Sequence, residues 1–533
     1  MKTYKTSALT LISILALTGC PSDDTDPGGD TDSSGTDSSD PTGDPSGDPT
    51  TETMTDTDDV TDTDDVTDTD DTDTDTDTDT AAGGAAVRVV HASPGAPAVD
   101  VYVMGIDEPV ITALAYGETS EYLPVDAGDY IFEVRATGEA PDSEPVFSTE
   151  SLPIAEGDSI TAIAAGQVGG EGDAAFRVLA LADGFGDAGD GALARIVHAG
   201  SDAPAVDIDV GNDGTAELEG VAPYADSGAE GVALPAGEAL QIGIGAGGEP
   251  VTAFTTPELT AGAPLYVIAT GLLSDLPRAE TGFSLLAVGP EGSIGFIDQN
   301  PRVYALHAGT DAPTVDICAA GTPLLEGVAY GALGGIQVPP GEYALDIHAT
   351  GDEACAGDPA FTANTPALAA GEQYLAVAAG ELATDDGGEG PDPDFTVEFF
   401  TEEFTYDPAS ADATAVVVHA ASAPSVTAGA LNMDGELAET FFQSLSFPNA
   451  SGEITVPAGE YVVGVAASRG AVLPIAGEDL AGAFGLTVAG GLSAFVVAHG
   501  SLDDTGGDQP FGMTAIVIGP GPWVPLPLPA AAQ

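Results

Sequence analysis

The sequence predicts an all-β protein in which four tandem immunoglobulin-like β-sandwich domains follow a disordered acidic N-terminal tether. Three observations lead to this fold class. One set of motifs recurs four times at a domain-sized interval of roughly 110 residues, apolar side chains alternate with period two, and glycine turns separate short apolar runs. Helical periodicity is absent, and an up-and-down barrel is the alternative architecture.

The expected organisation has seven parts, and each boundary follows a change in composition or the start of a new copy. They are a lipoprotein signal peptide (1–20), an Asp/Thr-rich linker (21–85), four β-sandwich repeats (86–191, 192–300, 301–413 and 414–525) and a flexible Pro-rich tail (526–533).

The charge balance excludes one large class of partners. The 533 residues hold 87 Asp and Glu against 9 Lys and Arg, a formal net charge of −78. Nucleic-acid binding needs a basic surface that neutralises phosphates, so no nucleic-acid partner is expected. With 43% hydrophobic residues, the chain still has enough apolar side chains to build cores.

The N-terminus has the pattern of an export signal. Lys2 and Lys5 precede an apolar run from Ala8 to Leu17, which is too short to span a bilayer. The run ends in Leu-Thr-Gly-Cys20, which resembles the lipobox of bacterial lipoproteins; an ordinary signal peptide with a chance cysteine is the alternative. With Pro21 rather than Asp after the cysteine, the resemblance implies lipidation at Cys20 and an outer-membrane anchor, facing the periplasm or the cell surface.

The segment that follows Cys20 is predicted to be a solvated spacer. It has almost no apolar residues, and Thr72 to Thr80 is a strict Thr-Asp alternation. Such a segment cannot offset its ordering entropy by burial, and like charges extend it. Weak Ca²⁺ binding and sugars on threonine are the alternative interpretations.

The four copies share an opening motif in which a histidine ends a short apolar strand. An Ala-Pro pair follows, and an aspartate stands nine residues after the histidine. An aromatic turn, two glycine turns and a closing strand complete each copy, with type II geometry expected at the first glycine turn. The motif residues are His91 and Asp100, His198 and Asp207, His307 and Asp316, and His419, whose copy has Thr427 in place of the aspartate. The closing strands are expected at Phe176–Leu181, Phe283–Val288, Phe395–Phe400 and Met513–Ile518.

The His and Asp of each copy are the strongest candidate for chemistry. A carboxylate near an imidazole can orient it as a base or a metal ligand. However, the sequence has no recognisable nucleophile or metal motif, and each copy supplies two ligands at most. We therefore expect a structural role, a hydrogen bond that pins the loop from the histidine to the proline, and no metal, cofactor or catalytic residue.

Taken together, the opening V-H-A-[SG]-x-x-A-P-x-V-D and the later Gly-Glu/Asp-Tyr turn resemble the bacterial domain of unknown function DUF4397. The resemblance covers about residues 86–520 in four copies, the fourth of them degraded at its aspartate. It implies a secreted or surface-associated β domain without an assigned activity.

Cys318 and Cys355 are expected to form a disulfide, because both lie in the third copy of an exported chain. A buried pair of free thiols and a copper or redox role are the alternatives. Loop acids such as Asp202, Asp213 and Asp311 are candidates for Ca²⁺, although no EF-hand loop is present.

The sequence predicts a non-enzymatic cell-envelope lipoprotein that serves as a structural or adhesive module. Its expected partners are the membrane, through the lipid anchor, and a polysaccharide or another envelope protein; repeated domains would add avidity. The alternatives are a calcium-dependent or polysaccharide-binding surface protein and a hydrolase of envelope polymers. The oligomeric state is left open.

Overall fold

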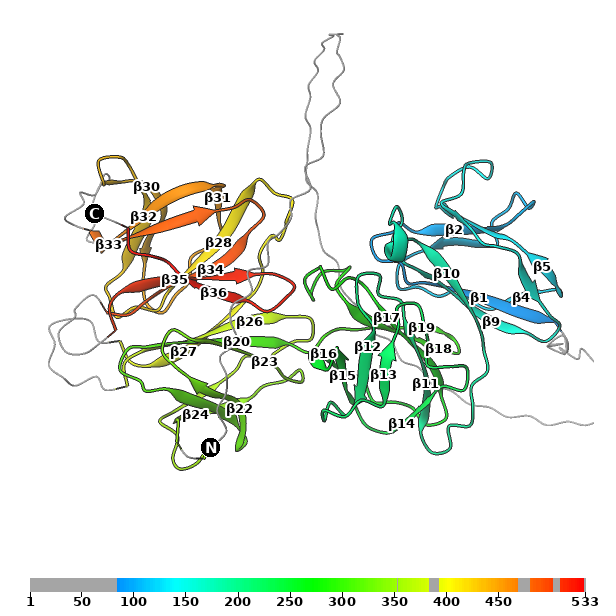
Figure 1. Ribbon diagram of the computed structural model, residues 1–533, viewed down its shortest axis with the longest axis horizontal. Coiled ribbons are helices and arrows are strands. Elements are labelled where there is room, and N and C mark those ends of the chain that lie inside the picture. The colour runs from blue at the N-terminus through cyan, green and yellow to red at the C-terminus, as the bar shows by residue number, and fades with distance from the viewer. Residues whose placement is uncertain (1–83, 352, 383–392, 468–479, 502–508, 532–533) are drawn as a thin grey trace, which may run out of the picture. The chain divides into compact units, whose positions relative to one another are not determined.

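The computed structural model describes residues 84–351, 353–382, 393–467, 480–501 and 509–531 (Figure 1). These residues form strands, with one short 3₁₀ helix at Gly172–Ala174. In these ranges no helix has the length and apolarity needed to cross a bilayer. Cys20 and most of the predicted linker lie outside the described residues. The described part belongs to one compact unit, Thr78–Gln533.

Repeat 1 is a sandwich of two four-stranded sheets. Its first sheet has the order β10-β9-β1-β4, its second sheet has the order β3-β2-β6-β7, and β5 pairs with β8 beside them. The strands are β1 (Ala85–His91), β2 (Val99–Val103), β3 (Ile111–Leu114), β4 (Leu123–Val125), β5 (Gly128–Tyr130), β6 (Phe132–Ala136), β7 (Phe147–Ser148), β8 (Leu152–Ile154), β9 (Ser159–Ala165) and β10 (Arg177–Ala182).

Repeat 2 has the same arrangement with one extra strand at the edge of its first sheet. The orders are β14-β11-β17-β18-β19 and β13-β12-β15-β16. The strands are β11 (Ala192–His198), β12 (Val206–Val210), β13 (Leu218–Val221), β14 (Val232–Leu234), β15 (Gln241–Ala246), β16 (Glu249–Thr255), β17 (Pro264–Thr270), β18 (Ser284–Gly289) and β19 (Gly292–Ile297).

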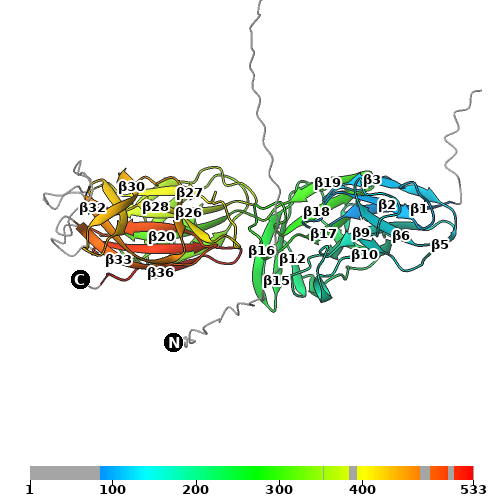
Figure 2. The ribbon, with the colours of Figure 1, turned by 90° about the horizontal axis from the view of Figure 1, so that it is seen from above.

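Repeats 3 and 4, whose labelled strands lie together in Figure 2, follow the same two patterns in turn. Repeat 3 has the orders β23-β20-β26-β27 and β22-β21-β24-β25, and repeat 4 has β31-β28-β34-β35-β36 and β30-β29-β32-β33. The strands of repeat 3 are β20 (Arg302–Gly309), β21 (Val315–Ala319), β22 (Thr322–Val328), β23 (Leu333–Gln337), β24 (Ala344–Ala349), β25 (Phe361–Asn364), β26 (Gln373–Gly380) and β27 (Thr396–Thr401). Those of repeat 4 are β28 (Asp412–His419), β29 (Val426–Leu431), β30 (Leu437–Leu445), β31 (Ile454–Pro457), β32 (Gly459–Ala467), β33 (Leu480–Val488), β34 (Ser493–His499), β35 (Gly512–Ile518) and β36 (Val524–Pro527).

These elements confirm the predicted class of repeated β-sandwiches, with one difference in strand direction. The pattern of alternation favoured antiparallel strands, whereas the first strand of every repeat pairs in parallel with a later one. The parallel pairs are β1 with β9, β11 with β17, β20 with β26, and β28 with β34. The chain crosses from the second sheet back to the first before each later strand, so that strand runs beside the first strand in the same direction.

The central strands of the first sheets, such as β11 and β20, are buried on both faces because the repeats dock against one another. One apolar cluster joins repeats 1 and 2 through Val90, Ala92, Val197 and Ala199, the residues on either side of each motif histidine. A second cluster joins repeats 3 and 4 through the equivalent residues Leu306, Ala308, Val418 and Ala420, and it also includes Leu276 of repeat 2. Strands buried on both faces have continuous apolar runs rather than alternation, which explains the openings of the four copies.

The Pro-rich end, predicted to be a flexible tail over residues 526–533, is ordered as far as it is described. β36 (Val524–Pro527) pairs with β35, and Leu528 N–H donates to the Met513 carbonyl at 2.8 Å. Ala531 N–H donates to the Ala483 carbonyl of the other sheet, also at 2.8 Å. The prolines alternate along this segment, so the intervening residues keep N–H groups that pair at an edge.

The predicted type II turns are only partly present. Gly237 has a φ of +82°, which fits the third position of a type II turn, whereas Gly341 has a φ of +151°, which favours glycine but does not fit that turn. Gly128 and Gly459 instead begin strands β5 and β32. At these two positions the tyrosine two residues later lies over the glycine, 3.5 Å and 3.4 Å from where a Cβ atom would stand.

Candidate functional site

The four motif histidines make the same hydrogen bond. Each stands at the end of the first strand of its repeat, and its Nε2 lies within hydrogen-bond distance of the proline carbonyl in the loop that follows. The distances are 3.2 Å for His91 and Pro97, 2.9 Å for His198 and Pro204, 2.9 Å for His307 and Pro313, and 3.1 Å for His419 and Pro424. Since a carbonyl accepts, Nε2 carries the proton and donates.

Burial keeps these rings neutral. All four histidines are at most 2% exposed, and desolvation lowers the pKa of each below its usual value. Among the described residues, Nδ1 of His198, His307 and His419 has no hydrogen-bond partner. A general base needs an accessible nitrogen within reach of a substrate. The bond to the proline therefore makes the histidine a brace for its loop.

The motif aspartates bind a different part of the fold. Their carboxylates accept backbone N–H groups on the neighbouring strand of the second sheet: Ala113 for Asp100 at 2.7 Å, Gly220 for Asp207 at 2.7 Å, and Gly327 for Asp316 at 2.8 Å. Each of these donors has a positive φ, between +52° and +66°, beside a shift in strand register. The aspartate thus holds a β-bulge in place.

In repeat 4, Thr427 accepts the N–H group of the bulge in place of the aspartate. Ser444, the residue at the equivalent bulge, has a φ of +53°, and its N–H donates to Thr427 Oγ1 at 3.3 Å. The substitution that marked the fourth copy as degraded therefore preserves the same contact with a hydroxyl instead of a carboxylate.

Two loop acids that were candidates for Ca²⁺ already accept backbone N–H groups. Asp202 accepts from Leu273 and Ser274, both at 2.9 Å, and Asp311 accepts from Leu382 at 2.8 Å. They tie the histidine loop to the segment that follows the parallel strand. Across the described ranges, no group of three or more His, Cys, Asp and Glu side chains is placed to hold a metal ion.

A reciprocal pair of arginines, which was not among the residues predicted from the sequence, joins repeats 1 and 2. Arg88 and Arg195 stand three residues before their motif histidines. Arg88 donates to the Gly289 carbonyl at the end of β18, and Arg195 donates to the Ala182 carbonyl at the end of β10, both at 2.6 Å. Each arginine therefore reaches from its own repeat to the closing strand of the other.

A carboxylate at this junction collects four hydroxyl donors. Asp183 accepts from Ser159 at 2.6 Å, Thr161 at 2.8 Å, Tyr122 at 2.8 Å and Tyr266 at 2.6 Å. These donors lower the pKa of Asp183 although its burial opposes this shift. The Arg88 guanidinium lies 4.7 Å from the ring centroid of Tyr122. The junction is a closed polar network inside an apolar contact.

Repeats 3 and 4 are joined by aromatic rings. Tyr304, three residues before His307, stacks on Trp523 with centroids 4.3 Å apart and an interplanar angle of 12°. Tyr330 is within 2.8 Å of His499 Nδ1, and His499 Nε2 is 2.9 Å from Thr514 Oγ1. The position three residues before the motif histidine thus contacts the neighbouring repeat in both pairs. It holds an arginine in repeats 1 and 2 and a tyrosine in repeat 3.

Cys318 and Cys355 form a disulfide with a Cα–Cα distance of 5.9 Å, which confirms the predicted pairing. Cys318, on β21, is fully buried. The disulfide lies in repeat 3 and closes a segment of 37 residues.

A family model, described as a domain of unknown function (DUF4397), matches residues 85–209 and 301–429. Each match spans one odd-numbered sandwich and the first two strands of the next. No curated protein matches the chain. Among solved structures, the Bacillus anthracis TIE protein is 10% identical with a TM-score of 0.12, over 78% of this chain and 68% of that one, and this likeness supports no argument about fold or function. The match confirms the predicted resemblance to DUF4397 in two stretches rather than over residues 86–520 in four copies, as expected of a DUF4397 domain-containing protein with repeated copies of the domain.

Proposed function

We propose that this protein is a non-enzymatic, lipid-anchored module of the cell envelope, which displays two docked pairs of β-sandwiches on an acidic tether and acts structurally or adhesively. The observation that carries the proposal is that the polar residues that recur in the copies bond to the backbone of their own repeat. The histidine of every copy braces its loop, and the aspartate or threonine holds a bulge. The residues that recur in the copies thus maintain a scaffold.

The docking of the repeats supports display rather than free motion of single domains. An apolar contact and two reciprocal arginines join repeats 1 and 2, and a cluster that includes Trp523 joins repeats 3 and 4. A partner that binds one pair meets a second pair on the same chain. Two sites on one chain raise the overall affinity for a repeating ligand without any new contact.

A pull-down tests the adhesive role. The full chain carrying Cys20→Ser is immobilised and exposed to envelope polysaccharide and to envelope proteins, and a variant that ends before residue 301 serves as the one-pair control. We expect retention of one of these partners, and weaker retention by the one-pair control. Soluble fragments released from the polysaccharide would point to a hydrolase instead, and retention abolished by a chelator would point to a calcium-dependent scaffold.

The lipid anchor has its own test. Fractionation of cells that express the native chain should place it with the membranes, and mass spectrometry should find an acylated peptide that begins at Cys20. The Cys20→Ser chain should leave the membrane fraction. A native chain recovered unacylated from the medium would refute the anchor and leave the adhesive role open.

A further inference from the structure

Each sandwich has a cavity between its two sheets, and the four cavities differ widely in volume. The cavity of repeat 3 measures about 60 Å³, against about 330 Å³ in repeat 2, 410 Å³ in repeat 1 and 710 Å³ in repeat 4. Protein interiors normally leave few voids larger than a water molecule. Repeat 3 is therefore packed as an ordinary core, whereas the other sandwiches are hollow.

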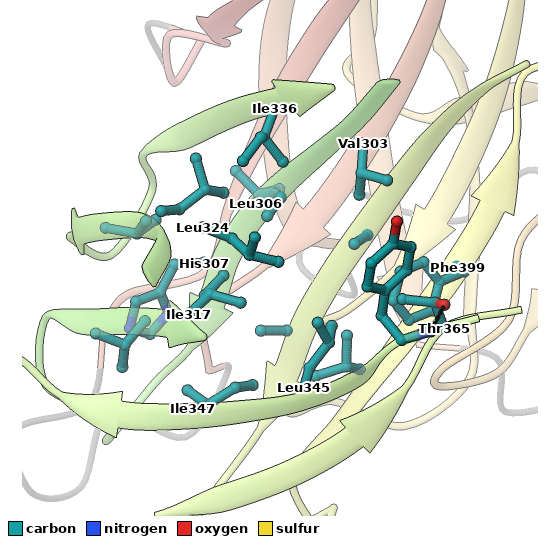
Figure 3. Close-up of a pocket in the computed structure, with 18 of the residues that line it drawn as sticks. Val303, Leu306, His307, Ile317, Leu324, Ile336, Leu345, Ile347, Thr365 and Phe399 are labelled. Atoms are coloured by element: carbon teal, nitrogen blue, oxygen red, sulfur yellow. Dashed lines mark hydrogen bonds between the residues drawn. The ribbon is translucent and has the colours of Figure 1, made fainter. Parts of the chain in front are cut away.

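One register position distinguishes the filled sandwich from the hollow ones. In repeat 3, Phe399 of β27 lies opposite Ala376 of β26, the strand that runs parallel to β20. Phe399 lines the cavity on the same side as Thr365 (Figure 3). The equivalent residues of the other three repeats are alanines that line their larger cavities: Ala180, Ala287 and Ala515. A phenyl ring thus occupies space that the other repeats leave empty.

A second position leaves repeat 2 more open than repeat 3. Tyr343 lines the cavity of repeat 3, and its hydroxyl donates to the Pro339 carbonyl at 2.6 Å. Tyr130 and Tyr461 make the same bond to a carbonyl four residues earlier. Repeat 2 has the exposed Ala239 at this position.

The hollow sandwiches of repeats 1 and 2 reach the surface at the same place. In each of these repeats, the segment that leads from the second sheet back to the first lines the cavity. This segment includes one exposed acid, Glu150 in repeat 1 and Glu258 in repeat 2. Apart from these mouths and the braced histidines, the walls are almost wholly apolar. Apolar walls favour apolar molecules over water; an apolar cavity of about 150 Å³ already binds benzene.

We propose that repeats 1 and 2 are binding sites for a linear apolar chain, such as the hydrocarbon chain of a lipid or of a free amphiphile, held between the two sheets with its head at Glu150 or Glu258. The carboxylate at each mouth favours an uncharged or cationic head and disfavours a carboxylate. Repeat 3, filled by Phe399, has no such site.

Native mass spectrometry of the full chain carrying Cys20→Ser tests the proposal, with 1-dodecanol as the probe and dodecanoate as its anionic counterpart. We expect dodecanol to bind, and Ala287→Phe and Ala180→Phe each to remove one equivalent. The gain-of-site control is Phe399→Ala, which should add one equivalent in repeat 3. Dodecanoate should bind about tenfold more weakly or worse, because its charge meets the acid at the mouth.

The outcomes separate cleanly. No uptake by the native sequence, or unchanged stoichiometry in both alanine-to-phenylalanine variants, overturns the proposal. If those variants fail to fold, Phe399→Ala decides alone, and no added equivalent would overturn the assignment. Loading from phosphatidylethanolamine vesicles identifies a membrane lipid as the source, whereas loading from dodecanol alone identifies a free amphiphile; either result supports a chain-binding site.

Discussion

Replacing Arg88 with methionine should loosen the docking of repeats 1 and 2. The side chain is 2% exposed, and its guanidinium donates to Thr161 Oγ1 at 3.0 Å and to the Gly289 carbonyl at 2.6 Å. Methionine keeps the apolar stem in place but has no donor for either acceptor. The Gly289 carbonyl, at the end of a fully buried strand, then loses a charged partner.

The expected loss can be worked out contact by contact. Two hydrogen bonds from a charged donor contribute about 1.5–3 kcal/mol each, and the stacking on Tyr122 adds about 0.5–1 kcal/mol. Methionine also removes the cost of desolvating the buried guanidinium, which offsets part of this loss. We therefore expect a net loss of about 3 kcal/mol in the free energy of unfolding, which for a cooperative unit of about 200 residues lowers Tm by roughly 6–12 °C.

Two optical signals make the assay specific. The chain has a single tryptophan, Trp523, buried in the cluster that joins repeats 3 and 4. In Arg88→Met, thermal unfolding followed by circular dichroism should shift, while the transition of Trp523 fluorescence stays close to that of the native chain. Arg177→Met is the matched control, because Arg177 stacks on Tyr224 at 3.7 Å but donates in an exposed setting. A shift in Arg88→Met no larger than in this control would refute the reasoning.

Three further changes have clear expected results. Replacing Cys318 and Cys355 by alanine should cost about 4 kcal/mol in the chain-entropy model, seen as a lower Tm by calorimetry; an unchanged Tm would contradict it. Burial lowers the pKa of His499 to about 4, so the unfolded chain binds this proton first, and stability should fall by about 1 kcal/mol as pH drops from about 6.5 to 5.5. His499→Asn should reduce that dependence in denaturant titrations by the share of this residue, because the four motif histidines, whose pKa values burial also lowers, keep theirs; an unaltered slope would exclude His499 as a contributor. Deleting residues 524–533 removes β36 and should lower the Tm reported by Trp523 fluorescence; an equal Tm would mean that the strand adds no stability.

The features that the sequence predicted well are those set by local patterns. Closing strands were expected at Phe176–Leu181 and Phe395–Phe400, and they run from Arg177 to Ala182 and from Thr396 to Thr401. Apolar alternation and glycine turns act within a few residues, so both can be recognised in a single copy. The disulfide was also predictable, because the two cysteines share one repeat of an exported chain.

Docking was not predicted, because it depends on residues that meet across repeats. The signal was nevertheless present at one position. An arginine in the middle of an apolar strand is unusual in a chain with nine cations, and it stands three residues before both His91 and His198. Fully buried arginines are rare unless they are paired. Their recurrence in copies 1 and 2, with Tyr304 at the same place in copy 3, indicates a contact surface.

The role of the motif aspartate illustrates why spacing alone did not assign partners. Nine residues separate His91 and Asp100, which invited a pairing of the two. The loop between them carries the chain from the first sheet to the second, so the two side chains serve different sheets. The histidine bonds inside its loop, and the aspartate bonds to a bulge whose existence depends on strand register.

The docked pair, rather than the single sandwich, is the natural repeating unit of this chain. The family matches begin at residues 85 and 301, one pair apart, and each ends in the second strand of the even-numbered repeat. After its closing strand, each even-numbered repeat adds an edge strand, β19 or β36, whereas the odd-numbered repeats lead into the junction through Asp183 and Phe404. In the odd-numbered repeats, the segment after the closing strand contacts the neighbouring repeat instead of forming an edge strand. These repeats therefore rely on the neighbouring repeat to bury the apolar face of their first sheet. A boundary placed between repeats 1 and 2 would therefore expose the apolar faces around Val90 and Val197. A boundary near residue 300 keeps the contacts within each pair but breaks the Arg278–Glu402 ion pair and the Gln337–Thr252 hydrogen bond between repeats 2 and 3.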